Sequence, residues 1–255
     1  MLKYAKIEGM VGDENLPGLN LSEMDLKIGN VPNWKILLDP DYTKEASYLN
    51  RCTGIDCFDI DGSPMTPNIV NESGNSFARY GDGDNPRIQC DVALPSDKIS
   101  IFGVLRPALK SSNNRFTLIT SNSAIEPIPQ LNFGFSGDLK TLGVSTRGNT
   151  NGGNENYMRI SYSPEVSFEN RLVYIMMTFS TENGLVLYEN GEKVAENKDD
   201  TRPFVLSDTS DLYTMLRGIC GDVGICGVVG DDLSLKKNMQ YKESIDAFLK
   251  GKYNM

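Results

Sequence analysis

Apolar and polar positions alternate in short runs along most of the chain, and the clearest run covers residues 171–197 (RLVYIMMTFSTENGLVLYENGEKVAEN). Two Asn-Gly dipeptides, Asn183-Gly184 and Asn190-Gly191, divide this run. Asn-Gly readily takes up the positive φ angles that both central residues of a type I′ turn require, so each dipeptide predicts a tight hairpin. The segment LVYIMMTF before them is continuously apolar except for one threonine, as expected for a strand covered on both faces. The pattern predicts three consecutive antiparallel strands, the first deep in a β-sandwich.

Similar short apolar runs follow one another through much of the chain, at intervals of about ten residues. They predict strands at residues 76–80, 87–94, 98–106, 115–120, 130–135, 139–145, 157–162 and 213–219. The segment 115–120 is expected to form a hairpin with 98–106. Residues 42–67 are polar and rich in turn residues, which favours a long ordered loop. Many short strands at this spacing are typical of an antiparallel sandwich or jelly roll.

The period of the apolar positions changes near the C-terminus. Tyr241, Ile245, Phe248 and Leu249 stand at helical spacing, and Gly251 is the expected C-cap. The predicted fold class is therefore all-β, an antiparallel jelly-roll β-sandwich with a short C-terminal helix.

The N-terminal segment, residues 1–32, mixes Gly, Pro and Asn with scattered leucines and has no sustained period. It is expected to be an extended N-terminal arm, followed by one sandwich domain at residues 33–255. The arm carries enough apolar side chains to pack either on its own domain or on a partner. Trp34, the only tryptophan, is expected to anchor the core or its edge.

Charge and composition exclude several partners. The chain has 25 basic and 34 acidic residues, for a net charge of −9, and its Lys and Arg are not clustered. Binding to a nucleic-acid backbone therefore has no electrostatic basis. No apolar run is long enough for a membrane span, and the first residues lack the apolar segment of a secretory signal. We expect synthesis in the cytoplasm without a signal peptide, and no membrane insertion.

Histidine is absent, which excludes every Ser-His or Cys-His mechanism and every His-ligated metal site within this chain. The five cysteines have no four-ligand zinc spacing. They are Cys52, Cys57, Cys90, Cys220 and Cys226. Most are expected to be buried thiols, although Cys52 with Cys57, or Cys220 with Cys226, could form a disulfide in an oxidising environment.

Two acidic segments are candidates for a calcium site. Asp82, Asp84 and Asn85 offer oxygen ligands on one tight turn, and the loop with Asp231 and Asp232 could lie at the same end of a sandwich. The alternative is a solvated turn closed by its own Asp and Asn side chains. No other cofactor is expected.

The order and spacing of motifs in the C-terminal half carry a family resemblance. LVLYENGEKVAEN, YTMLRGICG, the glycine-spaced GVVGDDLSL and the final YKESIDAFLKGKY follow one another. This succession resembles the concanavalin A-like lectin/glucanase superfamily, in its laminin-G/pentraxin-like branch. Residues 74–95 resemble an early strand-loop-strand of that family, and residues 98–107 resemble the strand that follows it. The tryptophan common in one strand of that family is absent, and Tyr174 stands nearest to its position.

The resemblance implies a scaffold that either binds or cleaves carbohydrate. Glucanases of the superfamily carry paired glutamates at alternate positions of one strand, written E-x-D-x-x-E, and the chain has no such pattern. Glu189 with Glu192 flank a turn instead, where solvated charge is the ordinary explanation. We therefore expect a protein that is not an enzyme, with a glycoside hydrolase relative as the weaker alternative.

Two functional interpretations stay open. The first is a lectin-like module that recognises a glycan or host receptor, because loop aromatic and amide side chains suit sugar rings and hydroxyls. Its candidate ligand-binding residues are Tyr80, Asp82, Asp84, Asn85, Arg147, Asn149, Asn154 and Tyr157. The second is a structural virion component, such as a phage tail or capsid-associated protein, whose arm contacts other assembly proteins or further copies of the chain. The two are compatible.

Overall fold

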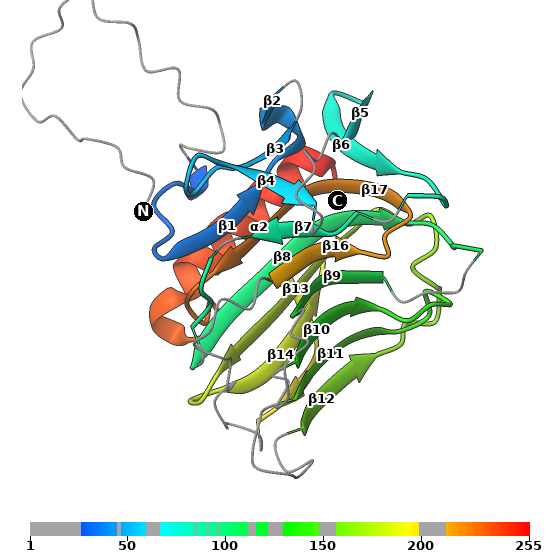
Figure 1. Ribbon diagram of the computed structural model, residues 1–255. Coiled ribbons are helices and arrows are strands. Elements are labelled where there is room, and N and C mark those ends of the chain that lie inside the picture. Colours follow the sequence, from blue (N-terminus) through cyan, green and yellow to red (C-terminus); the bar gives the residue numbers. More distant parts are fainter. Residues whose placement is uncertain are drawn as a thin grey trace, which may run out of the picture.

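The computed structural model describes residues 27–44, 47–59, 67–84, 86–90, 92–95, 97–111, 116–121, 130–147, 157–198 and 213–255. Over these residues the chain forms two antiparallel sheets packed face to face, with a helix on the outside of one of them (Figure 1). The predicted all-β sandwich with one C-terminal helix is confirmed. In this part of the chain, no helix has the length and apolar character needed to cross a membrane.

The first sheet has eight strands in the order β15-β14-β13-β8-β17-β6-β5, and β1 also pairs with β17. Its strands are β1 (Trp34–Leu38), β5 (Asn68–Glu72), β6 (Asn75–Tyr80), β8 (Lys98–Pro107), β13 (Val173–Ser180), β14 (Gly184–Glu189), β15 (Glu192–Asn197) and β17 (Gly221–Val229). The predicted unit of three antiparallel strands is therefore confirmed as β13, β14 and β15, at one end of this sheet.

The second sheet has nine strands in the order β12-β11-β10-β9-β16-β7-β4-β3-β2. They are β2 (Thr43–Lys44), β3 (Ser47–Asn50), β4 (Ile55–Asp59), β7 (Ile88–Cys90), β9 (Phe116–Ser121), β10 (Gln130–Phe135), β11 (Leu142–Arg147), β12 (Tyr157–Tyr162) and β16 (Tyr213–Arg217). Short 3-10 turns lie at Pro40–Tyr42 and Lys236–Asn238.

Two sequence predictions about these strands were wrong. Residues 42–67 are not one long loop, because β2, β3 and β4 form there and β4 pairs with β7. Strand β9 does not pair with β8 but with β10 and β16 in the opposite sheet. Both errors have one cause: pairing between distant segments outweighs local turn propensity and closeness in sequence.

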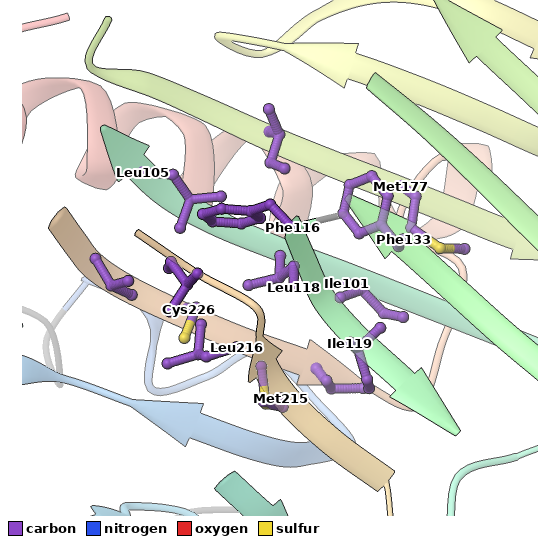
Figure 2. Packing of buried hydrophobic residues seen from close by; sticks show 14 of the residues in the cluster. Ile101, Leu105, Phe116, Leu118, Ile119, Phe133, Met177, Met215, Leu216 and Cys226 are labelled. Atoms are coloured by element: carbon purple, nitrogen blue, oxygen red, sulfur yellow. The ribbon is translucent and has the colours of Figure 1, made fainter. Parts of the chain in front are cut away.

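The main core lies between the two sheets and is built from the inward side chains of both. Leu105 and Met177 from β8 and β13 face Phe116, Leu118 and Phe133 from β9 and β10 (Figure 2). All five are at most 2% exposed. This close packing of long and aromatic side chains fixes the position of β9 and β10, which carry the surface discussed below.

A second apolar cluster covers the opposite face of the eight-stranded sheet. Helix α2 (Met239–Tyr253) places Ile245, Phe248 and Leu249 in one cluster with Tyr174 and Met176 of β13. Strand β13 is thus buried on both faces, which confirms the interpretation of its continuous apolar run.

The chain just before β1 joins the same cluster. Ile28 and Val31 are 1% exposed, and the indole N–H of Trp34 donates to the carbonyl of Ile28 at 3.3 Å. Residues 27–32 therefore pack on their own domain, and Trp34 is a core anchor as predicted. Residues 1–26 of the expected arm lie outside the described residues.

The end of α2 differs from the prediction. The helix continues through Gly251 to Tyr253, and Asn254 takes the left-handed conformation at φ 54° while its N–H donates to the carbonyl of Lys250. Asn tolerates this conformation better than most residues, so it ends the helix where glycine was expected.

Only one of the two Asn-Gly turns has the predicted type. Asn190 and Gly191 have φ angles of 51° and 81°, as a type I′ turn requires. At the first turn only Gly184 has a positive φ, 71°, so that turn is wider and its glycine acts as a left-handed bulge residue. A β-carbon on Gly184 would lie 2.1 Å from the carbonyl oxygen of Asn197.

The cysteines favour the buried-thiol interpretation. Cys52, Cys220 and Cys226 are free thiols, so neither suggested disulfide forms in this structure. Burial raises the pKa of the Cys52 thiol to about 12 and that of Cys226 above its usual range. High thiol pKa values make these groups poor nucleophiles.

Candidate functional site

A continuous row of polar residues crosses six neighbouring strands of the nine-stranded sheet, from β7 to β12. Each member is the direct cross-strand partner of the next. In order, the row is Gln89, Thr214, Thr120, Asn132, Ser145 and Arg159. At a strand spacing of about 4.8 Å, the row spans about 24 Å. Strands β16, β9, β10, β11 and β12 lie side by side in Figure 1.

Strand alternation places this row on the outer face of the sheet, where Thr120 and Thr214 are buried and Asn132, Ser145 and Arg159 are accessible. The flanking residues Leu131, Phe133, Val144 and Ile160 belong to the core between the sheets. Residues next to one another on a strand point to opposite faces, so Asn132 and Ser145 lie on the outside. The strands therefore have one apolar and one polar face, as antiparallel sheets with a solvated side do.

A hollow lies beside the row because glycine occupies two paired positions. Gly134 of β10 pairs with Gly143 of β11, one row further along the strands. The hollow has a volume of about 190 Å³. Its lining includes Asn132, Ser145, Arg159 and Ser161 from three adjacent strands. Hydroxyl, amide and guanidinium groups thus meet in one concave surface.

The two glycines have different structural constraints. A β-carbon on Gly134 would lie 2.1 Å from the carbonyl oxygen of Phe116, where the register between β9 and β10 shifts. A β-carbon on Gly143 would lie 3.4 Å from the carbonyl oxygen of Ile160, which is an ordinary contact. Gly134 is therefore required by the backbone, whereas Gly143 leaves space that a side chain could fill.

Hydrogen bonds orient the centre of the row. The hydroxyl of Thr120 donates to Oδ1 of Asn132 at 2.6 Å, which leaves the amide N–H groups of Asn132 to donate elsewhere. Next to Thr120, the hydroxyl of Thr214 is buried and has no hydrogen-bond partner among the described residues. At the rim of the hollow, Thr141 and Ser163 hydroxyls lie 2.9 Å apart. The surface presents both donors and acceptors.

The charge of this region is opposite in sign to that of the whole chain. Strands β9, β10, β11, β12 and β16 contain Arg147, Arg159 and Arg217 but no Asp, Glu or Lys. The chain as a whole carries a net charge of −9. Arg159 is exposed at the rim of the hollow. No carboxylate of the described residues forms an ion pair with it.

The residues predicted at the β6–β7 turn lie partly in the core and partly in hydrogen bonds of the turn. Tyr80 is 6% exposed and packs in the core between the sheets, so it cannot act as a surface platform for a sugar ring. Asp82 accepts from the backbone N–H of Ser111 at 2.9 Å, and hydrogen bonds from Ser111 lower the pKa of its carboxyl. Asp84 accepts from the N–H of Gly81 at 2.5 Å. Asn85 lies outside the described residues.

Asp231 and Asp232 are buried and already bonded. Asp231 accepts from the side-chain amides of Asn33 and Asn238 at 3.1 and 3.2 Å. Asp232 accepts from the hydroxyl of Ser180 at 2.5 Å and from Ser234. These bonds tie the loop after β17 to β13 and to the start of α2.

The structure separates the two acidic segments that were expected to lie together. The turn with Asp82 and Asp84 adjoins the start of β17, where Gly221 pairs with Tyr80, and the loop with Asp231 and Asp232 follows its end. Nine extended residues span about 30 Å. Within the described residues, no group of three or more acidic or cysteine side chains is arranged to hold a metal ion.

Two of the predicted loop residues flank the row. The backbone of Arg147 pairs with that of Tyr157, two residues along β11 and β12 from Ser145 and Arg159. Asn149 and Asn154, between these strands in the sequence, lie outside the described residues.

Sequence reasoning placed the site in loops and missed the strand residues Asn132, Ser145, Arg159 and Ser161. Polar residues at alternate positions of β10, β11 and β12 were a usable signal for an outer face. The order and register of the strands were not readable, however, and they are what bring these residues into one row.

Comparison with solved structures finds the same fold in bacterial toxin domains. The binding domain of botulinum neurotoxin serotype D matches 88% of this chain with a TM-score of 0.58 and 14% identity, and that of serotype G matches 86% with 0.58 and 15%. A serotype D ligand-binding domain in complex with N-acetylneuraminic acid matches 88% with 0.58 and 13%.

The chain spans about half the length of these solved structures, 51% to 52%. No family model matches the sequence. No curated protein sequence matches it either. The likeness establishes a shared β-sandwich fold, and the matched structures are described as binding domains.

Proposed function

We propose that this protein is a non-catalytic binding module of the concanavalin A-like, laminin-G-like type, and that it recognises a glycan along the polar row of the nine-stranded sheet. The observation that carries the proposal is the accessible end of the row, where Asn132, Ser145 and Arg159 stand in direct register beside a hollow lined by Gly134 and Gly143. The fold shared with receptor-binding domains, one of them solved with a sugar acid, supports it.

The chemistry of the row suits a hydroxylated ligand. Sugars present many hydroxyl groups that both donate and accept, and the row offers an amide, hydroxyls and a guanidinium. Thr120 and Thr214 are only 4% and 1% exposed, so the accessible part of the row is Asn132, Ser145 and Arg159. These three neighbouring strands span about 10 Å, a length that suits one or two sugar rings. A glycosidase needs a pair of carboxylates at its site. The strands of this surface contain no acidic residue, so they do not supply such a pair.

A glycan array with the intact chain tests this proposal, followed by titration calorimetry with each glycan that binds. Gly143→Ile fills the hollow at a position where a β-carbon fits, and should abolish binding while the protein remains folded. Lys193→Ile on exposed β15 is the matched control and should bind as the parent does. Binding that survives Gly143→Ile, or no binding to any glycan, would overturn the proposal.

Attachment to a virion or other assembly through the N-terminal arm is a further part of the proposal, and it rests on the sequence alone. Residues 27–32 belong to the domain, so the attaching segment would be residues 1–26. Deletion of residues 1–26 should leave the unfolding transition unchanged and remove self-association or incorporation into particles. Unchanged mass in solution and unchanged particle occupancy would contradict it.

A further inference from the structure

We infer that the glycan bound by this surface is an acidic one, and that Arg159 contacts its carboxylate. The inference rests on the proposed function, because it names the ligand class of the same hollow. The role of Arg159 decides which glycans bind, whereas the other residues of the row bind any suitable glycan.

The first argument is the separation of charge. The chain has nine more acidic than basic residues, yet the six strands that the row crosses contain three arginines and no acidic residue. Elsewhere acidic residues are frequent: Asp222 lies on β17 and Glu189 on β14 of the other sheet. Asp138, in the turn between β10 and β11, accepts from Ser136 of the hollow, but the strands themselves carry only positive charge. This charge reduces the repulsion that an anionic ligand would meet on an acidic protein.

The second argument is the state of the arginines. Arg51 pairs with Asp39, Arg79 and Arg106 pair with Asp222 and Glu72, and Arg171 pairs with Glu189. The charges of these guanidinium groups are thus already paired within the chain.

Arg159 differs from all of them. No carboxylate of the described chain pairs with its guanidinium, and its side chain lines the hollow. A guanidinium presents parallel N–H donors that match the two oxygens of a carboxylate. We therefore expect the carboxylate that pairs with Arg159 to belong to the ligand.

The third argument is position within the row. Arg159 is the direct partner of Ser145, which is the direct partner of Asn132. A sugar ring over the hollow could thus bond to the Asn132 amide and the Ser145 hydroxyl while its carboxylate reaches Arg159. Arg217 lies four strands away on β16, about 19 Å across the sheet, and does not line the hollow.

The experiment compares 3′-sialyllactose with lactose by calorimetry on the intact chain, with a sulfated heparin-derived oligosaccharide as a third ligand. The parent should bind sialyllactose more tightly than lactose. Arg159→Gln should reduce affinity for sialyllactose by roughly ten- to a hundred-fold, the range of one charge-assisted hydrogen-bonded contact, and leave lactose unchanged. Arg159→Lys should recover part of the loss, because it keeps the charge and loses the paired donors.

Arg217→Gln is the charge control, since it removes the same charge from the same sheet at a residue that does not line the hollow, although its cross-strand partner Thr117 does. It should change sialyllactose affinity by less than about three-fold, an effect that added salt removes. Equal loss in both variants would assign the preference to general charge and overturn the role of Arg159. Tighter binding of the sulfated ligand than of sialyllactose would overturn the carboxylate assignment.

Failure of this inference is distinguishable from failure of the proposed function. If lactose and sialyllactose bind equally and Gly143→Ile abolishes both, the glycan site stands and its acidic specificity is wrong. If neither they nor any array glycan binds, the proposed function itself fails.

Discussion

The two outer faces of this sandwich have opposite chemistry. On the eight-stranded sheet, the outer face carries Phe102, Tyr174 and Met176 and is covered by α2 and by residues 28–34. On the nine-stranded sheet, the outer face carries Asn132, Ser145 and Arg159 around an open hollow. Apolar outward residues on a strand require a cover, whereas polar ones leave the face available to water or a ligand.

Polar contacts are used differently on the two faces. Under α2, the carboxylate of Asp246 accepts from the Tyr174 hydroxyl at 2.8 Å and from Lys242 at 2.6 Å, and Lys242 also donates to the carbonyl of Gly191. The side chains of Asp246 and Lys242 thus use their hydrogen bonds to attach α2 to the sheet. On the open face, the amide of Asn132 and the guanidinium of Arg159 still have donors to offer. The comparison predicts that substitutions on the covered face change stability, and that those on the open face change binding.

The largest effect on stability is expected from weakening the packing of α2 on the eight-stranded sheet. Phe248 is 4% exposed and packs against the sheet, so Phe248→Ala should lower the free energy of unfolding by about 3–5 kcal/mol. Chemical denaturation monitored by circular dichroism measures this. Glu243→Ala, on the exposed side of the same helix, should change it by less than about 0.5 kcal/mol. A loss below about 1 kcal/mol for Phe248→Ala would mean that α2 contributes little to the fold.

The second effect separates two glycines that face each other across β10 and β11. Gly134→Ala should lower stability by about 3 kcal/mol, because its β-carbon would meet the Phe116 carbonyl at 2.1 Å. Gly143→Ala should be neutral or slightly stabilising, since alanine loses less backbone entropy on folding. Thermal unfolding of both variants tests the pair. Similar melting temperatures would show that the backbone can relax around Gly134.

The third effect concerns pH on the covered face. Burial, with the nearby charge of Asp232, raises the pKa of Tyr188 to about 12. Between pH 10 and 12 the unfolded state ionises this phenol while the folded state keeps it protonated, so stability is full below pH 10 and falls as pH rises. Tyr188→Phe should reduce by about 1–3 kcal/mol the fall in the free energy of unfolding that occurs as pH rises above 10. Unfolding curves at pH 9 and pH 11.5 measure it, and parallel losses in parent and variant would refute the assignment.

The smallest effect is expected on the open face. Ser161→Ala and Arg159→Gln lie at the hollow and away from the core, so each should change the free energy of unfolding by less than about 0.5 kcal/mol. A loss above about 1.5 kcal/mol in either would make that side chain part of the fold and weaken the contrast between the faces.

The fold class could be predicted from the sequence because strand signals are local. The apolar run of β13 and the helical spacing of Ile245, Phe248 and Leu249 each depend on a few neighbouring residues. The pairing of β9 with β16, and the strands within residues 42–67, could not be predicted because they depend on contacts between distant segments.

The candidate site could not be predicted for the same reason, because it depends on the pairing of distant segments. Tyr80 was expected on the surface because it stands beside a polar turn, but the alternation of β6 turns its ring into the core. Asn132 and Arg159 lie 27 positions apart in the sequence and meet only through the register of three strands. A row of this kind becomes visible once the strand order is known.

The position of β17 affects how the chain can fold. This strand, at residues 221–229, lies between β8 and β6 and also pairs with β1, so the middle of the eight-stranded sheet closes only when a late segment joins three much earlier ones. Contacts of such long sequence separation slow folding, and we expect refolding in milliseconds to seconds in stopped-flow experiments. Until β17 inserts, β8 and β6 expose unpaired edges, so intermediates that lack it are the species expected to aggregate.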